Sequence, residues 1–156
     1  MRTVDPGHFR SVMGNFATGV TVITATAGSG PVGMTANAVA SLSLEPLLLL
    51  VAFDNTARTL QVVRETERFG VNVLGAGQEE LARLFASKAP EDAKFAGVPH
   101  TLHDGLPVID RTIAWVGCRL ERLVDGGDHT IGIGAVESAE AGDGRPLLWF
   151  RGSYRA

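Results

Sequence analysis

The chain has 156 residues, of which 45% are apolar and 20% charged, with a formal net charge of −3. This length predicts a single domain over residues 1–156, and the composition excludes intrinsic disorder as the main state, because disordered chains combine low hydrophobicity with high charge. The acidic balance argues against nucleic-acid binding driven by bulk charge, and the longest apolar run, Leu47–Phe53, is too short to span a membrane.

The first predicted element is a short helix that starts at Asp5, with Pro6 in its first turn. Its apolar residues recur at helical spacing and would form one face: Phe9, Val12, Met13 and Phe16. The β-branched run Val20–Ala25 predicts a buried strand, which ends at a Gly-Ser-Gly-Pro turn.

The next segments alternate between strand and helix signals. Val32–Leu44 is rich in small and hydroxyl-bearing residues and predicts strand at both ends with an irregular middle. Leu47–Phe53 is apolar without alternation, which predicts a strand covered on both faces. Thr56–Arg64 predicts a helix capped by its first residue, with Leu60 and Val63 pointing inward.

The middle of the chain contains a further strand, a helix and an apparent loop. Phe69–Leu74 predicts a strand, and Gln78–Ser87 a helix with apolar residues on one face. Lys88–Pro107 predicts a long surface loop, the kind of segment that often carries function.

Hairpin signals dominate the last third of the chain. Ile113–Val124 alternates, a glycine-rich turn follows it, and Ile131, Ile133 and Ala135 continue a second strand. Leu147–Phe150 would close the sheet. Six or seven strands joined mostly by turns, with three short helices, predict a closed or nearly closed antiparallel barrel with appended helices.

Two groups that could carry chemistry have simpler interpretations. His100 and His103 lie beside Asp104, but their glycine- and proline-rich surroundings favour solvated loop histidines over metal ligands, so we expect no metal site. Cys118 lies on the apolar face of its strand, which favours a small buried hydrophobe over a nucleophile. The single cysteine, together with the lack of an apolar signal segment at the N-terminus, favours a cytoplasmic location.

The segment Gly33–Ser43 is unusual because its polar residues share one parity: Thr35, Asn37, Ser41 and Ser43. This face is either exposed to solvent or a ligand groove, in which small side chains let a flat ring approach the backbone and amides and hydroxyls bind it. His129 opens a strand after a glycine turn, as a structural residue or as part of a cleft. Lys88 and Lys94 are surface residues or border the same groove.

Four stretches of the chain together resemble a known family, the short-chain flavin reductases: Phe9–Thr24, Gly33–Leu47, Gly127–Val136 and Arg145–Tyr154. These proteins are the reductase components of two-component flavin-dependent monooxygenases. The resemblance implies a mainly β fold, a Greek-key type antiparallel split barrel of six to seven strands with peripheral helices. It also implies a homodimer that binds FMN or FAD near the subunit interface.

The resemblance also implies site residues. Those expected to bind the flavin are Thr35, Ala36, Asn37, Ala38, Ser41, Leu42, Ser43, Asp54, Thr59, Phe85, Ala86, Ser87, Lys88, Phe95 and, at the rim, Tyr154. Asp54 and Thr59 would flank the phosphate-bearing arm, and His129 would lie beside the nicotinamide. Ala38 and Ala57 stand where many relatives have serine.

The function implied by the resemblance is transfer of hydride from NADH or NADPH to FMN or FAD. The reduced flavin would then diffuse to a partner monooxygenase. The cofactors themselves carry out the hydride transfer, so the protein is expected to orient the nicotinamide and flavin rings and to need no general base. Two alternatives stay open: a non-catalytic flavin-binding protein on the same fold, and a protein-interaction module, which would leave the polar face at Thr35–Ser43 unexplained.

Overall fold

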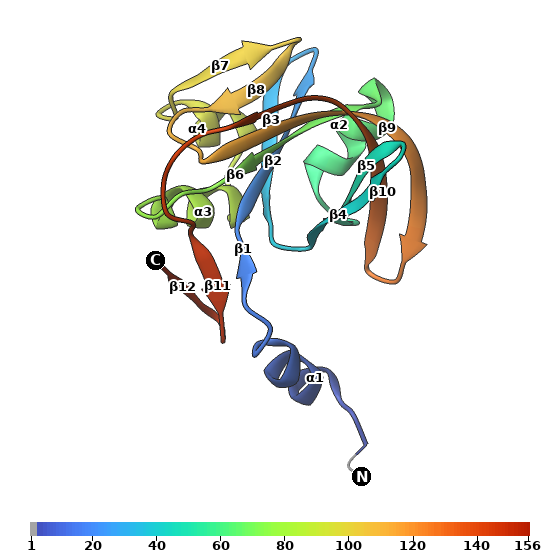
Figure 1. Ribbon diagram of the computed structural model, residues 1–156, viewed down its shortest axis with the longest axis vertical. Coiled ribbons are helices and arrows are strands. Elements are labelled where there is room, and N and C mark those ends of the chain that lie inside the picture. Colours follow the sequence, from blue (N-terminus) through green and yellow to red (C-terminus); the bar gives the residue numbers. More distant parts are fainter. Residues whose placement is uncertain (1–2) are drawn as a thin grey trace.

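The computed structural model describes residues 3–156, and its main feature is one seven-stranded antiparallel sheet (Figure 1). Its order is β3-β2-β6-β9-β10-β5-β4, and the strands are β2 (Thr21–Ala27), β3 (Gly30–Ala36), β4 (Val39–Leu44), β5 (Leu47–Asp54), β6 (Arg68–Val73), β9 (Ala114–Gly126) and β10 (His129–Ala141). The two edge strands, β3 and β4, are consecutive in the chain, with only Asn37 and Ala38 between them. The sheet therefore curls until its two edges meet at this link, which confirms the predicted split barrel.

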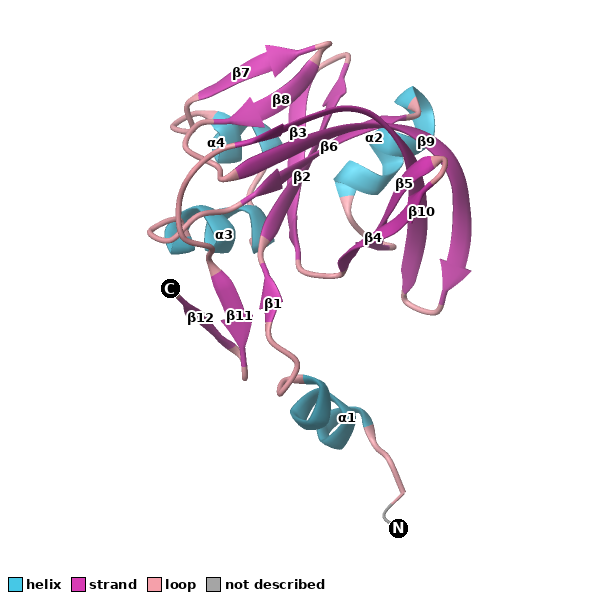
Figure 2. Ribbon diagram, viewed as in Figure 1, coloured by secondary structure: helices cyan, strands magenta, loops and turns pink. Residues whose placement is uncertain are grey.

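Smaller elements surround this barrel in the described residues. The helices are α1 (Pro6–Met13), α2 (Arg58–Thr66), α3 (Glu79–Ala86) and α4 (Glu91–Phe95). The remaining strands are β1 (Thr18–Gly19), β7 (His100–His103), β8 (Leu106–Ile109), β11 (Leu148–Phe150) and β12 (Ser153–Arg155). Figure 2 shows α2, α3 and α4 close to the sheet, whereas α1 extends away from it.

Aromatic side chains fill the barrel interior. Phe53 and Phe69 are fully buried and meet edge to face, with ring centroids 5.8 Å apart. Two glycines of β10 make room for them, because a Cβ atom at Gly132 would lie 2.7 Å from the Phe53 ring and one at Gly134 would lie 2.6 Å from the Phe69 ring. Leu60 of α2 packs into the same core. Each buried Phe contributes roughly 1.5–3 kcal/mol, so the small residues of β10 are part of the barrel's packing.

A second core lies on the outer side of β2. Val22 packs there with Phe85 of α3 and Leu147, whereas the next residue, Ile23, packs inside the barrel. β2 is therefore covered on both faces. The prediction that β5 has this role is wrong, since its side chains alternate and Leu48, Leu50 and Ala52 stay partly exposed. The strand itself lies where it was predicted.

The predicted loop Lys88–Pro107 is also wrong. It contains α4, β7 and the start of β8, and Phe95 and Leu106 within it are buried. His100 and His103 lie on β7 instead of in a loop. Elements of four or five residues are too short to show a helical or alternating period, so the sequence pattern does not reveal them.

Three further boundaries differ from prediction. β11 pairs with β1 and β12 in a separate three-stranded sheet, so Leu147–Phe150 does not close the barrel. α1 ends at Met13, which leaves Phe16 beyond the helix, although Asp5 caps it as predicted, accepting the His8 N–H at 2.8 Å. α2 begins at Arg58 and not at Thr56, because both the N–H and the hydroxyl of Thr56 donate to Asp54.

Cys118 is fully buried in the barrel core, and burial raises the pKa of its thiol to about 12. This environment confirms the prediction of a small hydrophobe, because a reactive thiolate needs a lowered pKa. Among the helices of residues 3–156, none has both the length and the apolar character needed to cross a membrane.

Candidate functional site

A polar cleft of about 310 Å³ lies between β3, the start of α2 and the connection from α3 to α4. It brings together seven of the residues expected to bind the flavin: Thr35, Asp54, Thr59, Phe85, Ala86, Ser87 and Lys88. These positions come from four separate parts of the sequence, and only the packing of α2 and α3 against β3 makes them neighbours.

The start of α2 gives this cleft the character of an anion site. Ala57 occupies the N-cap position and offers no side-chain hydrogen bond, so the first N–H groups of the helix lack a side-chain partner. Thr59, in the first turn, is 1% exposed, and its hydroxyl has no hydrogen-bond partner within residues 3–156. An unpaired buried hydroxyl is costly, and a helix N-terminus attracts negative charge. Both features fit a phosphate group bound in the cleft.

Positive side chains line the same cleft. Arg58 and Lys88 are exposed, whereas Lys94 of α4 is buried. The Lys94 ammonium lies 3.4 Å from Glu91 and 3.5 Å from the carbonyl oxygen of Gly33, and the other Glu91 oxygen accepts the Gly33 N–H at 3.1 Å. The Glu91–Lys94 pair therefore ties α4 to β3 and leaves a cation at the cleft wall.

Asp54 lies at the end of β5, next to both the cationic side chains and His129. Hydrogen bonds from the Thr56 hydroxyl, at 2.7 Å, and from its N–H, at 2.8 Å, hold the pKa of the Asp54 carboxyl below its ordinary value, and the charges of His129 and Lys88 act in the same direction. Asp54 stands opposite His129 in the pairing of β5 with β10. It therefore links the polar cleft with a second one.

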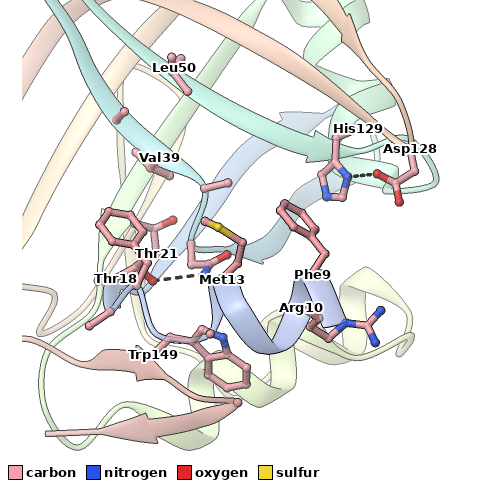
Figure 3. A pocket seen from close by; sticks show the side chains of 18 of the residues that line it. Phe9, Arg10, Met13, Thr18, Thr21, Val39, Leu50, Asp128, His129 and Trp149 are labelled. Carbon is pink, nitrogen blue, oxygen red and sulfur yellow. Dashed lines mark hydrogen bonds and ion pairs between the residues drawn. The ribbon is translucent and has the colours of Figure 1, made fainter. Parts of the chain in front are cut away.

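This second, wide cleft has a volume of about 1090 Å³ and lies beside α1 (Figure 3). Its walls are largely apolar and include Phe9, Met13, Leu50 and Trp149. Three residues of the expected site line it instead of the polar cleft: Asn37, Ala38 and His129.

The polar groups of the wide cleft are held by short-range contacts. The Asn37 amide donates to the Thr18 hydroxyl at 3.2 Å, and His129 Nδ1 lies 2.7 Å from the Asp128 carboxylate. In Figure 3 the His129 ring points into the cleft toward Phe9. The positive φ of Gly127 makes the hairpin turn that places His129 at this edge.

The other expected residues lie outside both clefts. Ala36 is buried in the barrel core, and a bulge in β4 breaks the register between Ser41 and Ser43, so the predicted continuous polar face does not form. Phe95 packs edge to face on Phe85, with ring centroids 4.9 Å apart. The others away from the two clefts are Leu42, exposed on β4, and Tyr154, which packs on Trp149 beneath Arg83 and whose phenol pKa is raised by burial.

Arg58 lines the polar cleft but was not predicted as a member of the site. It could have been identified as the first residue after an uncapped helix start. Lys94, for which a surface position and a position at the groove were both left open, lines the polar cleft. Its burial was not predicted, because α4 is too short to show a sequence signal. Within residues 3–156, no three His, Cys, Asp or Glu side chains gather as metal ligands would.

Comparison with known proteins finds relatives that are similar to this chain over nearly its whole length. The chain is 43% identical over 157 residues to the reductase subunit of a flavin-dependent monooxygenase from Mycobacterium tuberculosis, covering 97% of this chain and 82% of that protein. It is 35% identical over 156 residues to an NADH-dependent flavin reductase of a Rhodococcus species, covering 98% and 87%.

A solved structure is similar over the same length. The NADH:FAD oxidoreductase from Streptomyces globisporus, in complex with NAD and FAD fragments, matches with a TM-score of 0.91 and 39% identity, over 100% of this chain and 96% of that chain. The profile of the flavin reductase like domain matches residues 13–156. The chain therefore belongs to the flavin reductase like domain family.

Proposed function

We propose that this protein is an NADH- or NADPH-dependent flavin reductase that transfers hydride to FMN or FAD and supplies reduced flavin to a partner monooxygenase. The relatives named above support the activity and the kind of partner. The observation that carries the proposal is the unpaired Thr59 hydroxyl at the uncapped start of α2, inside a cleft lined by cations.

The polar cleft would hold the flavin phosphate. The Thr59 hydroxyl donates a hydrogen bond to it, the first N–H groups of α2 point toward it, and Arg58 and Lys88 supply compensating charge. A charge-assisted hydrogen bond of this kind contributes about 1.5–3 kcal/mol. The unpaired Thr59 hydroxyl, which destabilises the free protein, would thus stabilise the complex with the flavin.

The link Asn37–Ala38 and His129 would position the two reacting rings. When bound, the flavin supplies the hydride-accepting atom. The small side chain of Ala38 leaves the backbone accessible to a flat ring, and the Asn37 amide oxygen can accept a hydrogen bond from it. Because Asp128 engages His129 Nδ1, the other ring nitrogen remains to bind the nicotinamide carboxamide or a phosphate. The protein acts by orientation and needs no general base at the donor carbon.

We also infer that the protein is a homodimer of single-domain chains, located in the cytoplasm. The apolar residues Phe9, Val12, Met13 and Phe16 are about half or more exposed, and within the described chain no residue of α1 is buried. A helix of eight residues is marginal without tertiary packing, and a second copy would cover this face and the exposed side of β5.

Thr59→Val tests the phosphate site. The substitution keeps the shape and removes the hydroxyl, so the affinity for FMN should fall by about 10-fold or more, while the affinity for riboflavin, which has no phosphate, should stay the same. Thermal unfolding should be unchanged or shifted slightly upward, because an unpaired buried hydroxyl is lost. Fluorescence titration measures both affinities.

Thr66→Val is the matched control, because Thr66 lies at the other end of α2 and its hydroxyl already donates to Val62 at 2.9 Å. It should bind FMN as the wild type does. Equal FMN affinities for wild type and Thr59→Val would contradict the phosphate assignment. Flavin binding without flavin-dependent loss of NADH or NADPH absorbance would instead favour the non-catalytic alternative.

A further inference from the structure

The turn before His129 is attached to the rest of the molecule through one residue, Asn55. Gly127 and Asp128 form this turn between β9 and β10, and Gly126 pairs with His129 at its base. The Asn55 side-chain amide donates to the carbonyl oxygen of Gly127 at 3.0 Å, and the Asn55 backbone N–H donates to that of Asp128 at 3.1 Å. Within residues 3–156, these are the hydrogen bonds that join the turn to a segment outside its own hairpin.

The neighbours of the Asn55 amide allow it only one orientation. A carbonyl oxygen can only accept a hydrogen bond, so the NH₂ group must face Gly127 and the amide oxygen must face the other way. There the amide oxygen accepts a hydrogen bond from the Thr130 hydroxyl at 2.6 Å. Thr130 is 3% exposed and follows His129 on β10. Because a buried hydroxyl without a partner is costly, Thr130 and Asn55 fix each other.

Asn55 stands at the boundary between the polar cleft and the wide cleft. It follows Asp54, the last residue of β5, which pairs with His129. Its chain neighbours Asp54 and Thr56 line the polar cleft, whereas His129 lines the wide cleft. Asn55 is not among the described residues that line either cleft. It is therefore placed to fix the position of one cleft relative to the other without touching a ligand in either.

The other contacts of the turn hold it only weakly. The pairing of β10 with β5 ends at His129 and Asp54, so Gly127 and Asp128 project beyond it. The Asp128 carboxylate lies 2.7 Å from His129 Nδ1, but the Asp128 side chain is 96% exposed. An ion pair exposed to this degree does little to hold two side chains in one geometry. The place of the His129 ring therefore depends on the backbone of the turn, which Asn55 holds.

We propose that Asn55 is a positioning residue, which holds the β9–β10 turn so that the His129 imidazole reaches the nicotinamide beside the bound flavin. This inference rests on the proposed function, because it takes His129 as the nicotinamide contact. Reaction between two bound rings depends on small changes in their distance and angle. Asn55 acts on this geometry through His129 and contacts neither ring.

Asn55→Ala, made in two backgrounds, tests the proposal by steady-state kinetics at saturating flavin. In wild type it should lower kcat/KM for NADH by about 5–20-fold, mainly through a higher KM, and leave the dissociation constants for FMN and riboflavin unchanged. In the His129→Ala background it should change kcat/KM by less than about 2-fold, because the group that it positions is gone. A residue that only stabilised the fold would have the same effect in both backgrounds.

Thr130→Val is a second variant that decides the proposal independently. It keeps the shape of the side chain and removes the hydroxyl that orients the Asn55 amide. It should therefore lower kcat/KM for NADH in wild type and not in His129→Ala. Thr130→Ser keeps the hydroxyl and should retain the wild-type kcat/KM. The test thus stands even if Asn55→Ala folds poorly.

Gln78→Ala is the matched control, because the Gln78 amide also joins two segments of the chain. It accepts a hydrogen bond from the Gly75 N–H at 2.8 Å and donates to the carbonyl oxygen of Asp110 at 3.2 Å. Gln78 is not among the described residues that line either cleft. Its loss should lower Tm about as much as Asn55→Ala does and leave kcat/KM for NADH at the wild-type value.

The proposal is overturned if Asn55→Ala and Thr130→Val keep the wild-type kcat/KM, if their losses are equal in both backgrounds, or if Gln78→Ala causes the same loss. It is also overturned if His129→Ala alone has no effect, because Asn55 then has nothing to act through. Failure of the proposed function has a different signature, which overturns both proposals: wild type oxidises neither NADH nor NADPH with either flavin. A wrong assignment of Asn55 leaves a wild type that is active.

Discussion

The polar cleft and the wide cleft differ in how much of each is built by one chain. The polar cleft is enclosed by α2, α3 and β3, elements that pack against the two hydrophobic cores. The wide cleft has α1 as one wall, and that helix has no buried residue in the described chain. The polar cleft is therefore fully formed by a single chain, whereas the shape of the wide cleft depends on what packs against α1.

This difference has a functional consequence. Preorganised donors bind a charged group without reorganising, which suits the permanent charge of a phosphate. The neighbouring cleft, where the rings would meet, is wider and largely apolar. We expect phosphate recognition to survive in an isolated chain and ring positioning to require the assembled protein.

The largest expected effect comes from disrupting the apolar face of α1, which tests whether ring positioning needs the assembled protein. Phe9→Asp places a charge on the apolar face of α1 and should weaken a dimer by about 2–4 kcal/mol, enough to give monomer at micromolar concentration in sedimentation velocity. NADH oxidation should fall with it, because the wide cleft loses its cover.

Leu102→Asp provides the control, because Leu102 is equally exposed but lies on β7, outside the wide cleft. It should leave the sedimentation coefficient unchanged. A Phe9→Asp protein that sediments like wild type would show that α1 does not contribute to an interface.

A smaller effect is expected in the wide cleft, at the link between β3 and β4. Asn37→Leu removes the amide between β3 and β4 and adds bulk, which should cost about 1–3 kcal/mol in flavin binding. Riboflavin and FMN should lose equal affinity in fluorescence titrations, in contrast to Thr59→Val, which affects only the phosphorylated flavin. Unchanged affinities would remove Asn37 from the site.

The next prediction concerns the nicotinamide side alone. His129→Ala should lower kcat/KM for NADH by about 10–100-fold, equivalent to roughly 1.4–2.7 kcal/mol, and leave flavin affinity almost unchanged. Steady-state kinetics at saturating flavin measures this. If the variant has wild-type parameters, His129 is an ordinary residue at the start of β10.

The smallest effect concerns Asp54, which borders the polar cleft and faces His129. Because its folded-state pKa is lowered, first by the Thr56 hydroxyl, the ionised carboxylate stabilises the fold above its ordinary pKa of about 4, and this contribution is lost as the pH falls through the lowered value. In Asp54→Asn the Tm should therefore decrease less steeply as the pH is lowered. At neutral pH the free energy of unfolding should change by less than about 1 kcal/mol.

Asp125→Asn, an exposed change in the β9–β10 hairpin, is the comparison for this measurement. Its Tm profile should follow that of wild type across the acid range. An Asp54→Asn profile that does the same would show that the carboxylate contributes nothing measurable to folding.

Local signals in the sequence account for most of the barrel. The β-branched run of β2, the alternation of β9 and the glycine turn before β10 each depend on neighbouring residues, and each element lies close to its predicted position. α4, β7 and β8 were not predicted, because elements of four or five residues are recognisable only by what they pack against.

The site divides in the same way. The family resemblance identified Thr35, Asp54 and Thr59, which the fold brings to one cleft. The resemblance did not show that Asn37 and His129 line a different cleft from these three residues. Thr35 and Asn37 are only two residues apart, but they face different clefts because β3 ends between them and the chain crosses to β4.

The order of residues alone determined most strands of the barrel, their turns and the capped start of α1, because hydrophobic period, glycine and proline act over a few residues. Tertiary structure decided that β2 is covered on both faces and β5 is not, since β2 lies between two cores and β5 borders only one. It also decided that Lys94 is a buried cation and that the Thr59 hydroxyl has no partner within residues 3–156. Burial and hydrogen bonding depend on segments distant in the chain, so no local pattern encodes them.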